Sequence, residues 1–413
     1  MQAVKRGLSV WIPALLVLAC LSGCGRGTNP RLILVSFDGF RWDYLDRTQT
    51  PHLDRLVSTG VRAARLIPVF PTKTFPNHYS IVTGLYPEHH GIVANNMYDP
   101  LLDASFSLAN REAVAASRWW GGEPIWVTAA RAGRKSATLF WPGSEAEIKG
   151  YRPTYWVKYK AGMSDRNRVH QVLAWLDLPE EERPVFLAAY FSTTDSVGHD
   201  FGPESGELRE AVRHLDEMTG LLIDGLASRG LLERVNLIFT SDHGMTELDP
   251  SRRIFLDDYL DLSSLRVVDW SPVAALRPGP ADVDKVFEAL RGAHPHLEVY
   301  RKEEIPERFH YREHRRIAPL IAIADEGWTI TTHGRVSELE AAGRRMARAS
   351  HGFDNQLESM QGLFLAHGPA FRKGRLIRPF VNVHIYPLMA HLLGLAPAPN
   401  DGNLETVREL LKE

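Results

Sequence analysis

The sequence predicts an α/β fold in which a mostly parallel central sheet carries helices on both faces. Apolar runs of strand length alternate with helical patterns along the chain, as expected for a parallel sheet. The first run, over 31–37, reads RLILVSF and is typical of a strand that is buried on both faces. With 413 residues, the chain can hold one large α/β domain or two small ones.

Further strands and helices are expected to alternate after this first run. A threonine–proline pair at 50–51 is typical of a helix start, and this helix should run towards Gly60. Leucine and valine recur at helical spacing over 208–226, which indicates an amphipathic helix. A last helix is expected over 384–393, ended by Gly394. The other runs that we expect to form strands are 137–140, 185–191, 235–240 and 363–366.

The composition is that of an ordinary globular protein, with 44% hydrophobic and 24% charged residues. Its 48 basic and 50 acidic residues nearly balance, so the net charge gives no support for a nucleic-acid-binding face. The two cysteines, Cys20 and Cys24, both lie near the N-terminus. The body of the protein can therefore form neither a disulfide nor a cysteine-based metal site.

Residues 1–23 have the pattern of an export signal. Two basic residues precede an apolar stretch over 8–21, which is too short for a comfortable membrane span. The sequence LSGC at 21–24 resembles the lipobox of bacterial lipoproteins; the alternative is an ordinary secretory signal with a chance cysteine. The lipobox implies a lipid on Cys24 and firm anchoring in a membrane. Residues 24–30 would then be a tether, and the protein would lie in the cell envelope, on the periplasmic side of the outer membrane or at the cell surface.

Acidic and imidazole side chains follow three of the predicted strands at the point where each strand ends. They are Asp38, Asp195 and the adjacent Asp242 and His243. The carboxyl ends of parallel strands meet at one edge of an open sheet, which is where ligands bind. Each residue alone has an ordinary alternative, because aspartates cap turns and histidines often only form hydrogen bonds. Their coincidence predicts one site.

Two more residues complete a set of metal donors. His199 lies four residues after Asp195, in reach of the same ion if the backbone turns, and His351 stands beside Gly352 in a loop. Asp242 and His243 are adjacent, so they would point in opposite directions on an extended strand. They can face one ion only if the chain turns after the strand. Carboxylates and imidazoles are ligands that zinc-like ions accept, and the set can complete two sites with three protein ligands each. Two such metal ions side by side are a recurring feature of enzymes that act on phosphate esters.

A threonine near the start of a predicted helix is the candidate nucleophile. The segment 71–84 predicts a loop that enters a helix, with Thr74 as its cap and Pro76 in the first turn. A helix N-terminus offers free N–H groups to a phosphoryl group, and a divalent ion can activate a hydroxyl. Thr72 satisfies nearly the same argument, and a capping role without chemistry is the alternative for either residue.

Five segments resemble the nucleotide pyrophosphatase/phosphodiesterase family, which belongs to the alkaline phosphatase superfamily. The resemblance runs from about residue 31 to the C-terminus and implies an alkaline-phosphatase-like fold. The segments are VSFDGFR around Asp38, PTKTFPNHYS around Thr74, GLYPEHHG ending at Gly91, DSVGH from Asp195 and TSDHGM around Asp242.

The resemblance implies two zinc ions and selects Thr74 over Thr72 as the nucleophile. One zinc would be held by Asp195, His199 and His351, and the other by Asp38, Asp242 and His243, with Thr74 on this second ion.

The same resemblance implies substrate contacts. Asn95 matches an asparagine that helps to hold a phosphate oxygen, Phe75 and Tyr159 match aromatic residues that sandwich a nucleobase, and Tyr190 matches a pocket tyrosine. Without the family, these would be turn or packing residues. Asn96 stands where some vertebrate members have a lysine near the substrate, which leaves the preference among nucleotides open.

The expected function is hydrolysis of nucleotide phosphodiester or pyrophosphate bonds through a phosphothreonine intermediate. One alternative is another hydrolase of the superfamily, acting on phosphomonoesters, phosphonates or phospholipid-headgroup diesters. The other is a lipoprotein that binds zinc or nucleotides without catalysis. We expect a bacterial, single-domain member of the family, without the somatomedin-like and nuclease-like modules of larger animal relatives. Its catalytic domain would span 31–413, with the less regular and more charged stretch 254–349 as an elaboration of it.

Overall fold

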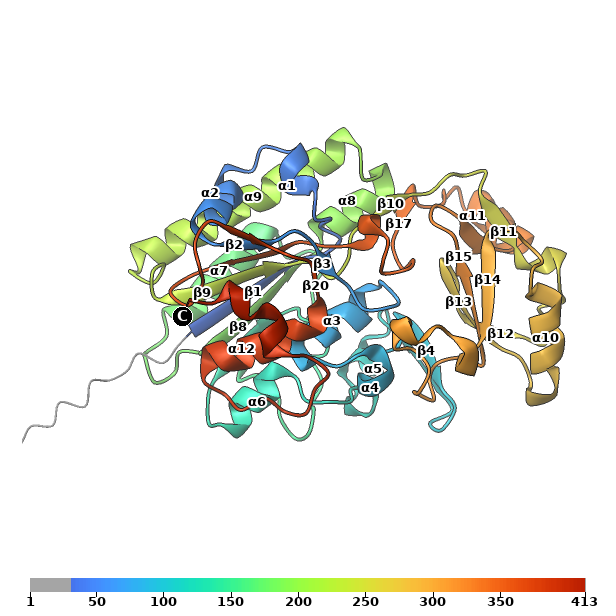
Figure 1. The fold of residues 1–413 in the computed structure, drawn as a ribbon, viewed down its shortest axis with the longest axis horizontal. Coiled ribbons are helices and arrows are strands. Elements are labelled where there is room, and N and C mark those ends of the chain that lie inside the picture. The colour runs from blue at the N-terminus through green and yellow to red at the C-terminus, as the bar shows by residue number, and fades with distance from the viewer. Residues whose placement is uncertain (1–30, 413) are drawn as a thin grey trace, which may run out of the picture.

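Strand β1 (Arg31–Phe37) lies in the middle of the central sheet and is buried along its whole length. It pairs in parallel with β8 (Phe186–Phe191) on one side and with β9 (Val235–Thr240) on the other. The computed structural model describes residues 31–412 of the chain (Figure 1). The predicted signal, the predicted tether and Cys24 lie outside the described residues.

The central sheet has eight strands in the order β19-β2-β18-β9-β1-β8-β6-β7. The pairs on either side of β18 (Phe364–His367) are antiparallel, and every other neighbouring pair is parallel, so this strand alone runs against the rest of the sheet. The mostly parallel sheet is therefore confirmed. The remaining strands of the sheet are β2 (Val61–Ala63), β6 (Ser136–Leu139), β7 (Tyr155–Val157) and β19 (Arg375–Ile377).

Helices cover both faces of this sheet, as predicted (Figure 1). Leu32 and Leu34 of β1 pack on one face, while Ile33 and Val35 pack on the other, because side chains alternate along a strand. The first face is covered by α3 (Thr74–Thr83), α6 (Ile125–Arg131) and α12 (Ile385–Leu393). The second is covered by α2 (Pro51–Thr59), α7 (Asp165–Leu176) and α9 (Gly206–Ser228).

The start of α3 differs by one position from the prediction. Thr74 is the first helical residue and not the cap, because the extended backbone of Lys73 occupies the cap position. The side chain of Asn95 accepts a hydrogen bond from the Phe75 N–H group at 2.9 Å, and so supplies a cap from another segment. The Thr74 hydroxyl is therefore not used to cap its own helix.

The stretch 254–349 contains a second, smaller sheet, which we call the antiparallel sheet. Its strand order is β12-β13-β15-β14, and all its pairs are antiparallel. It has a hydrophobic core of its own and packs beside the central sheet, with α10 (Val283–Leu290) on its outer side (Figure 1). The strands are β12 (Arg266–Asp269), β13 (Val273–Arg277), β14 (Leu297–Arg301) and β15 (Leu320–Ala324).

Short elements connect these parts. A hairpin of β4 (Asn96–Asp99) and β5 (Ala104–Ser107) lies against β12. The other helices are α1 (Tyr44–Arg47), α4 (Pro87–His90), α5 (Arg111–Ala115), α8 (Thr193–Phe201) and α11 (His333–Ala341). The other short strands are β3 (Leu66–Ile67), β10 (Thr246–Glu247), β11 (Arg253–Phe255), β16 (Thr329–Thr331), β17 (Ala349–Ser350) and β20 (Phe380–Val381).

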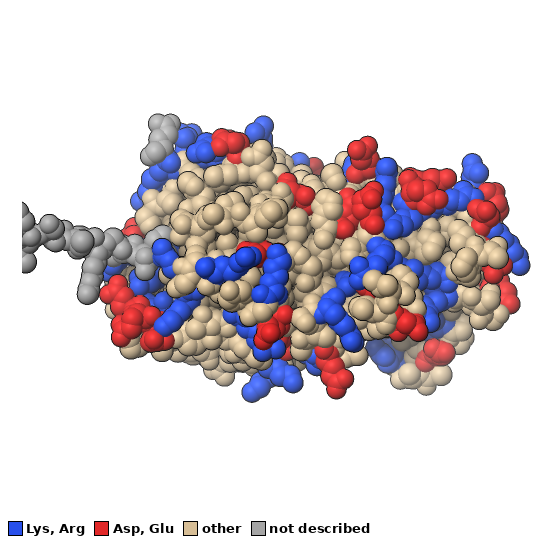
Figure 2. Space-filling view, turned by 90° about the horizontal axis from the view of Figure 1, so that it is seen from below, with Lys and Arg blue, Asp and Glu red and all other residues tan. Residues whose placement is uncertain are grey.

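The surface carries both signs of charge. Figure 2 shows basic and acidic side chains interspersed over one face of the molecule. Over residues 31–412, the structure contains no helix that combines the length and the apolar character needed to cross a membrane.

Candidate active site

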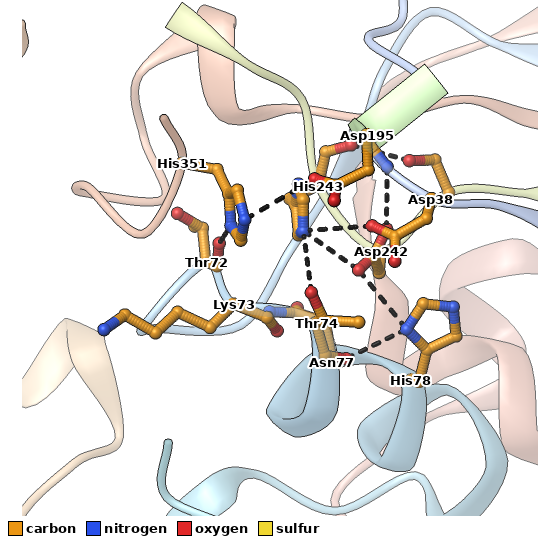
Figure 3. A network of polar contacts seen from close by, with 12 residues as sticks. Asp38, Thr72, Lys73, Thr74, Asn77, His78, Asp195, Asp242, His243 and His351 are labelled. Carbon is orange, nitrogen blue, oxygen red and sulfur yellow. Dashed lines mark hydrogen bonds and ion pairs between the residues drawn. The ribbon is translucent and has the colours of Figure 1, made fainter. Parts of the chain in front are cut away.

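Six predicted donors meet at the carboxyl edge of the central sheet, in two groups of three. The inner group is Asp38, Asp242 and His243, and the outer group is Asp195, His199 and His351. Within each group, one ligand atom from every residue lies within 4.8 Å of the others. Figure 3 shows the inner group together with Asp195 and His351 of the outer group. This is the division that the family resemblance implies.

The inner group is built from the ends of two adjacent strands. Asp38 follows β1, and Asp242 and His243 follow β9. The turn after β9 brings the Asp242 Oδ2 atom to 3.0 Å from His243 Nε2, so the adjacent pair converges as its predicted turn requires. The Asp38 Oδ1 atom lies 3.3 Å from the same nitrogen.

The outer group joins a helix to a distant loop. Asp195 and His199 lie one turn apart on α8, with Asp195 Oδ1 at 3.3 Å from His199 Nε2 and at 3.6 Å from His351 Nε2. Gly352 has a φ of +111°, and a Cβ atom there would meet Pro272 Cδ at 2.8 Å. The loop that carries His351 therefore requires the predicted glycine.

The hydrogen bonds of the three histidines orient their rings towards the two groups. The Nδ1 atoms lie at 2.8 Å from the Ala349 carbonyl (His199), at 2.9 Å from the Gly244 carbonyl (His243) and at 2.8 Å from the Thr72 carbonyl (His351). A carbonyl only accepts, so each Nδ1 must be the protonated donor. In their neutral form the rings therefore present Nε2 lone pairs to the two groups, which is the arrangement of histidines that bind metals.

Three buried carboxylate oxygens in the site lack a hydrogen-bond donor among the described residues. They are Asp38 Oδ1, Asp195 Oδ1 and Asp242 Oδ2. Burial and the neighbouring Asp242 carboxylate raise the pKa of Asp38 well above its usual value. Lone pairs and negative charges that converge without donors are costly to bury, and cations relieve this cost. The nitrogen–oxygen donor set fits divalent ions of the zinc type.

The two groups differ in their access to solvent. The inner residues Asp38, Asp242 and His243 are at most 1% exposed. The side chains of Asp195 and His199 are 18% and 31% exposed. The outer group lines a pocket of about 260 Å³, which is also lined by Asp38, Thr74, Phe75, Asn95, Tyr159 and Tyr190. The predicted substrate residues therefore share one pocket with the donors.

The geometry distinguishes the two threonines. The Thr74 hydroxyl lines the pocket and lies 3.4 Å from His243 Nε2, beside the inner group (Figure 3). The Thr72 hydroxyl is fully buried, donates to the Phe353 carbonyl at 3.0 Å and accepts from the Gly352 N–H at 2.8 Å. Thr72 therefore holds the loop of His351, whereas Thr74 faces the pocket.

Three further residues that line the pocket have defined contacts within it. The Tyr190 hydroxyl donates to Asp38 Oδ2 at 2.5 Å, so this tyrosine orients an inner carboxylate. The Asn95 oxygen is used by the Phe75 N–H group, which leaves its Nδ2 amide as the donor for a ligand. Tyr159 packs its ring against Phe140, with ring centroids 5.2 Å apart.

Sequence reasoning missed His78, which is fully buried beside the inner group. Its Nδ1 atom donates to the Thr74 carbonyl at 2.9 Å and lies 3.3 Å from Asp242 Oδ2, while Nε2 accepts from the Ser36 hydroxyl at 2.8 Å. The spacing of four residues after Thr74 could have identified this residue, because it places both on one side of a helix.

It also missed Arg111, Trp141 and Glu145, which line the pocket. Arg111 forms an ion pair with Glu145, and its guanidinium lies 5.4 Å from the centroid of the Tyr159 ring. No local pattern signals this set, because Arg111 comes from a different segment of the chain than Trp141 and Glu145.

Comparison with known proteins adds independent findings. The model of the type I phosphodiesterase / nucleotide pyrophosphatase family matches residues 32–354. Human ectonucleotide pyrophosphatase/phosphodiesterase family member 5 is 42% identical over 382 residues, covering 92% of this chain and 78% of the human protein. A mouse bis(5'-adenosyl)-triphosphatase is 44% identical over 386 residues, covering 92% of this chain and 81% of the mouse protein. The solved structure of murine family member 5, an inactive threonine-to-alanine variant in complex with AMP, matches with a TM-score of 0.88 and 42% identity, over 93% of this chain and 100% of that one.

Proposed function

Since the chain belongs to the type I phosphodiesterase/nucleotide pyrophosphatase family, and is thereby a hydrolase, we propose that it cleaves nucleotide diesters or pyrophosphates with Thr74 as nucleophile. The observation that carries this proposal is that the Thr74 hydroxyl lies 3.4 Å from His243 Nε2, in a pocket shared with carboxylates whose buried oxygens lack a hydrogen-bond donor among the described residues. We propose two zinc ions as the cations, one for each group. When bound, they would favour the ionised hydroxyl and offset charge on the phosphoryl oxygens.

The residues of the chain divide the reaction between them. Thr74 Oγ1 bonds to phosphorus as the bond from phosphorus to the leaving-group oxygen breaks, and the hydroxyl proton passes to the leaving group or to solvent. Water then cleaves the phosphothreonine and restores the hydroxyl. The Asn95 Nδ2 amide donates to a non-bridging phosphoryl oxygen, next to the N-terminus of α3.

Three observations support a nucleotide as substrate. Phe75 and Tyr159 line the pocket with aromatic surface of the kind on which a base stacks. Murine family member 5 binds AMP in its inactive threonine-to-alanine form. A second mouse relative is named bis(5'-adenosyl)-triphosphatase. By analogy, Phe75 and Tyr159 would hold the base while Thr74 meets the phosphate.

Rates on two substrates test this proposal. We expect a nucleotide aryl diester to be hydrolysed faster than the matching aryl phosphate monoester by purified, zinc-loaded protein. Faster cleavage of the monoester, or of a phospholipid-headgroup diester, would reject the proposed substrate class. Zinc uptake without turnover of any of them would favour a binding protein.

The proposed location rests on residues 1–24 alone. The LSGC sequence at 21–24 supports a bacterial lipoprotein that is anchored through Cys24 on the periplasmic side of the outer membrane or at the cell surface. Mass spectrometry of the membrane-extracted protein should find a diacylglycerol-modified Cys24. A protein that is cut elsewhere and carries no lipid would contradict the anchor.

A further inference from the structure

We infer that Asp269, on the antiparallel sheet, is a positioning residue that holds the nucleophile Thr74 and the amide of Asn95 in register. The inference rests on the proposed function, in which these two residues act on the same phosphoryl group. It assigns a task to the antiparallel sheet, which supplies none of the six metal donors.

The Asp269 carboxylate binds both segments at once. It is the last residue of β12 and is 8% exposed. Its Oδ2 atom accepts from Lys73 Nζ at 2.5 Å, and its Oδ1 atom accepts from Asn96 Nδ2 at 3.3 Å and from the Trp270 N–H at 3.1 Å. Both carboxylate oxygens therefore accept hydrogen bonds. Two of the three donor groups belong to residues outside the antiparallel sheet, Lys73 and Asn96.

The two side chains that donate to Asp269 belong to the chain neighbours of Thr74 and Asn95. Lys73 directly precedes Thr74, and Asn96 directly follows Asn95. The Asn95 side chain in turn accepts from the Phe75 N–H group. The contacts therefore form a closed ring, from Asp269 through Lys73 to the start of α3, and back through Asn95 and Asn96.

Lys73 is turned to this ring and not to the pocket. Its side chain is buried, extends away from the metal donors and is absent from the residues that line the pocket (Figure 3). Its stem also limits the loop of His351, because a Cβ atom on Gly352 would lie 3.1 Å from Lys73 Cε. The Asp269 ion pair therefore fixes the Lys73 side chain, which belongs to the residue before Thr74 and packs against Gly352, next to His351.

Alignment is a better explanation of this ion pair than stability. A buried ion pair gains little over apolar residues of the same volume, because both charges lose their hydration. Its directional bonds do, however, fix the geometry of the segments they join, and a misplacement of about 1 Å costs a reaction about 10²-fold. Asp269 touches neither the pocket nor the donors, so its loss should affect turnover and leave substrate and metal binding in place.

Three variants of the full, zinc-loaded protein test the inference on a nucleotide aryl diester. Asp269→Asn should lower kcat by about 10-fold to 100-fold while KM stays within about threefold and zinc content is unchanged. Asn96→Ala removes one bond of the ring and keeps the Lys73 ion pair, so it should lower kcat by about threefold to tenfold.

The matched control is Glu88→Gln. Glu88 is a buried carboxylate of α4 that accepts from the N–H groups of Arg312 and Glu313, so it also joins the central part to the stretch 254–349. It lies outside the ring, and its variant should lose thermal stability but keep kcat within about twofold of the wild type.

Equal kcat losses in Asp269→Asn and Glu88→Gln would overturn the inference, as would a change confined to KM or zinc content. If Asp269→Asn fails to fold, the Asn96→Ala result decides, and an unchanged kcat there rejects the role. A wild-type protein without turnover would contradict the proposed function itself, and the inference would fall with it. Active wild type with unaffected Asn96→Ala would reject the inference alone.

Discussion

The inner and outer metal groups use the same donor types but are assembled differently. The inner group takes Asp38, Asp242 and His243 from the ends of the adjacent strands β1 and β9, and it is closed to solvent. The outer group takes two donors from α8 and one from a loop that returns after the antiparallel sheet, and its Asp195 and His199 side chains are partly exposed. Ligand residues at strand ends are thus almost fully covered by protein, while a helix and a returning loop leave ligand residues that are partly exposed.

The largest effect is expected from removal of the Thr74 hydroxyl, which lies beside the inner group. Thr74→Ala should lower kcat on a nucleotide diester on the order of 10⁴-fold or more, because it removes the hydroxyl that attacks phosphorus, while both zinc ions stay bound. Turnover and metal content should be measured on the same preparation.

Thr72→Val is the control for this substitution. It breaks the bonds to Gly352 and Phe353 but leaves Thr74 in place, so it should weaken the outer group and retain measurable turnover at saturating zinc. An active Thr74→Ala protein with an inactive Thr72→Val protein would reverse the assignment of the nucleophile.

Tyr190→Phe should affect the inner group alone. The lost hydroxyl donates to Asp38 Oδ2, and removal of such a supporting bond typically costs about 10-fold to 100-fold in metal affinity. Chelator competition without substrate measures this affinity for each ion. Tyr79→Phe is the matched control, because its buried hydroxyl donates to the Gly121 carbonyl and not to a metal-binding residue. Equal effects of the two variants on zinc would contradict the role of Tyr190.

Acid should weaken the outer group. Burial of the ring opposes its charge, but the close contact with the Asp195 carboxylate raises the pKa of His199 to about 9 in the metal-free protein. Below this pKa, a metal must displace a proton from His199, so zinc affinity should fall by about tenfold for each unit of pH below 9. Titration of the metal-free protein between pH 6 and 9 measures this slope. A zinc affinity independent of pH would show that no proton is displaced.

Gly352→Ala is expected to have the smallest effect. The backbone there is left-handed and a Cβ atom meets Pro272, so the variant should lose about 1–3 kcal/mol of stability and bind the outer zinc several-fold more weakly. Gly133→Ala is the control, since it shares the left-handed backbone but has open space around it. Thermal unfolding of both variants separates the clash from the backbone strain. Equal losses would mean that Pro272 imposes no constraint.

Much of the central sheet could be predicted from local sequence. The runs over 31–37 and 235–240 coincide with β1 and β9, because a strand covered on both faces needs a continuous apolar stretch. The reversed direction of β18 could not be predicted, since a run of four buried residues indicates a strand but not its direction in the sheet. The antiparallel sheet was also missed, because two of its three strand pairs, β13–β15 and β14–β15, join segments that are separated in the sequence.

The sequence by itself determined which side chains can act and where each stands on its own element. Asp38 ends a strand, Asp195 and His199 share one turn of a helix, and Thr74 opens a helix, because these are local properties of the chain. Only the tertiary structure decided which hydroxyl faces the pocket, that Tyr190 supports Asp38, and that Asp269 joins Lys73 to Asn96. Those contacts join residues that are far apart along the chain, so they depend on strand order and packing, which no local pattern encodes.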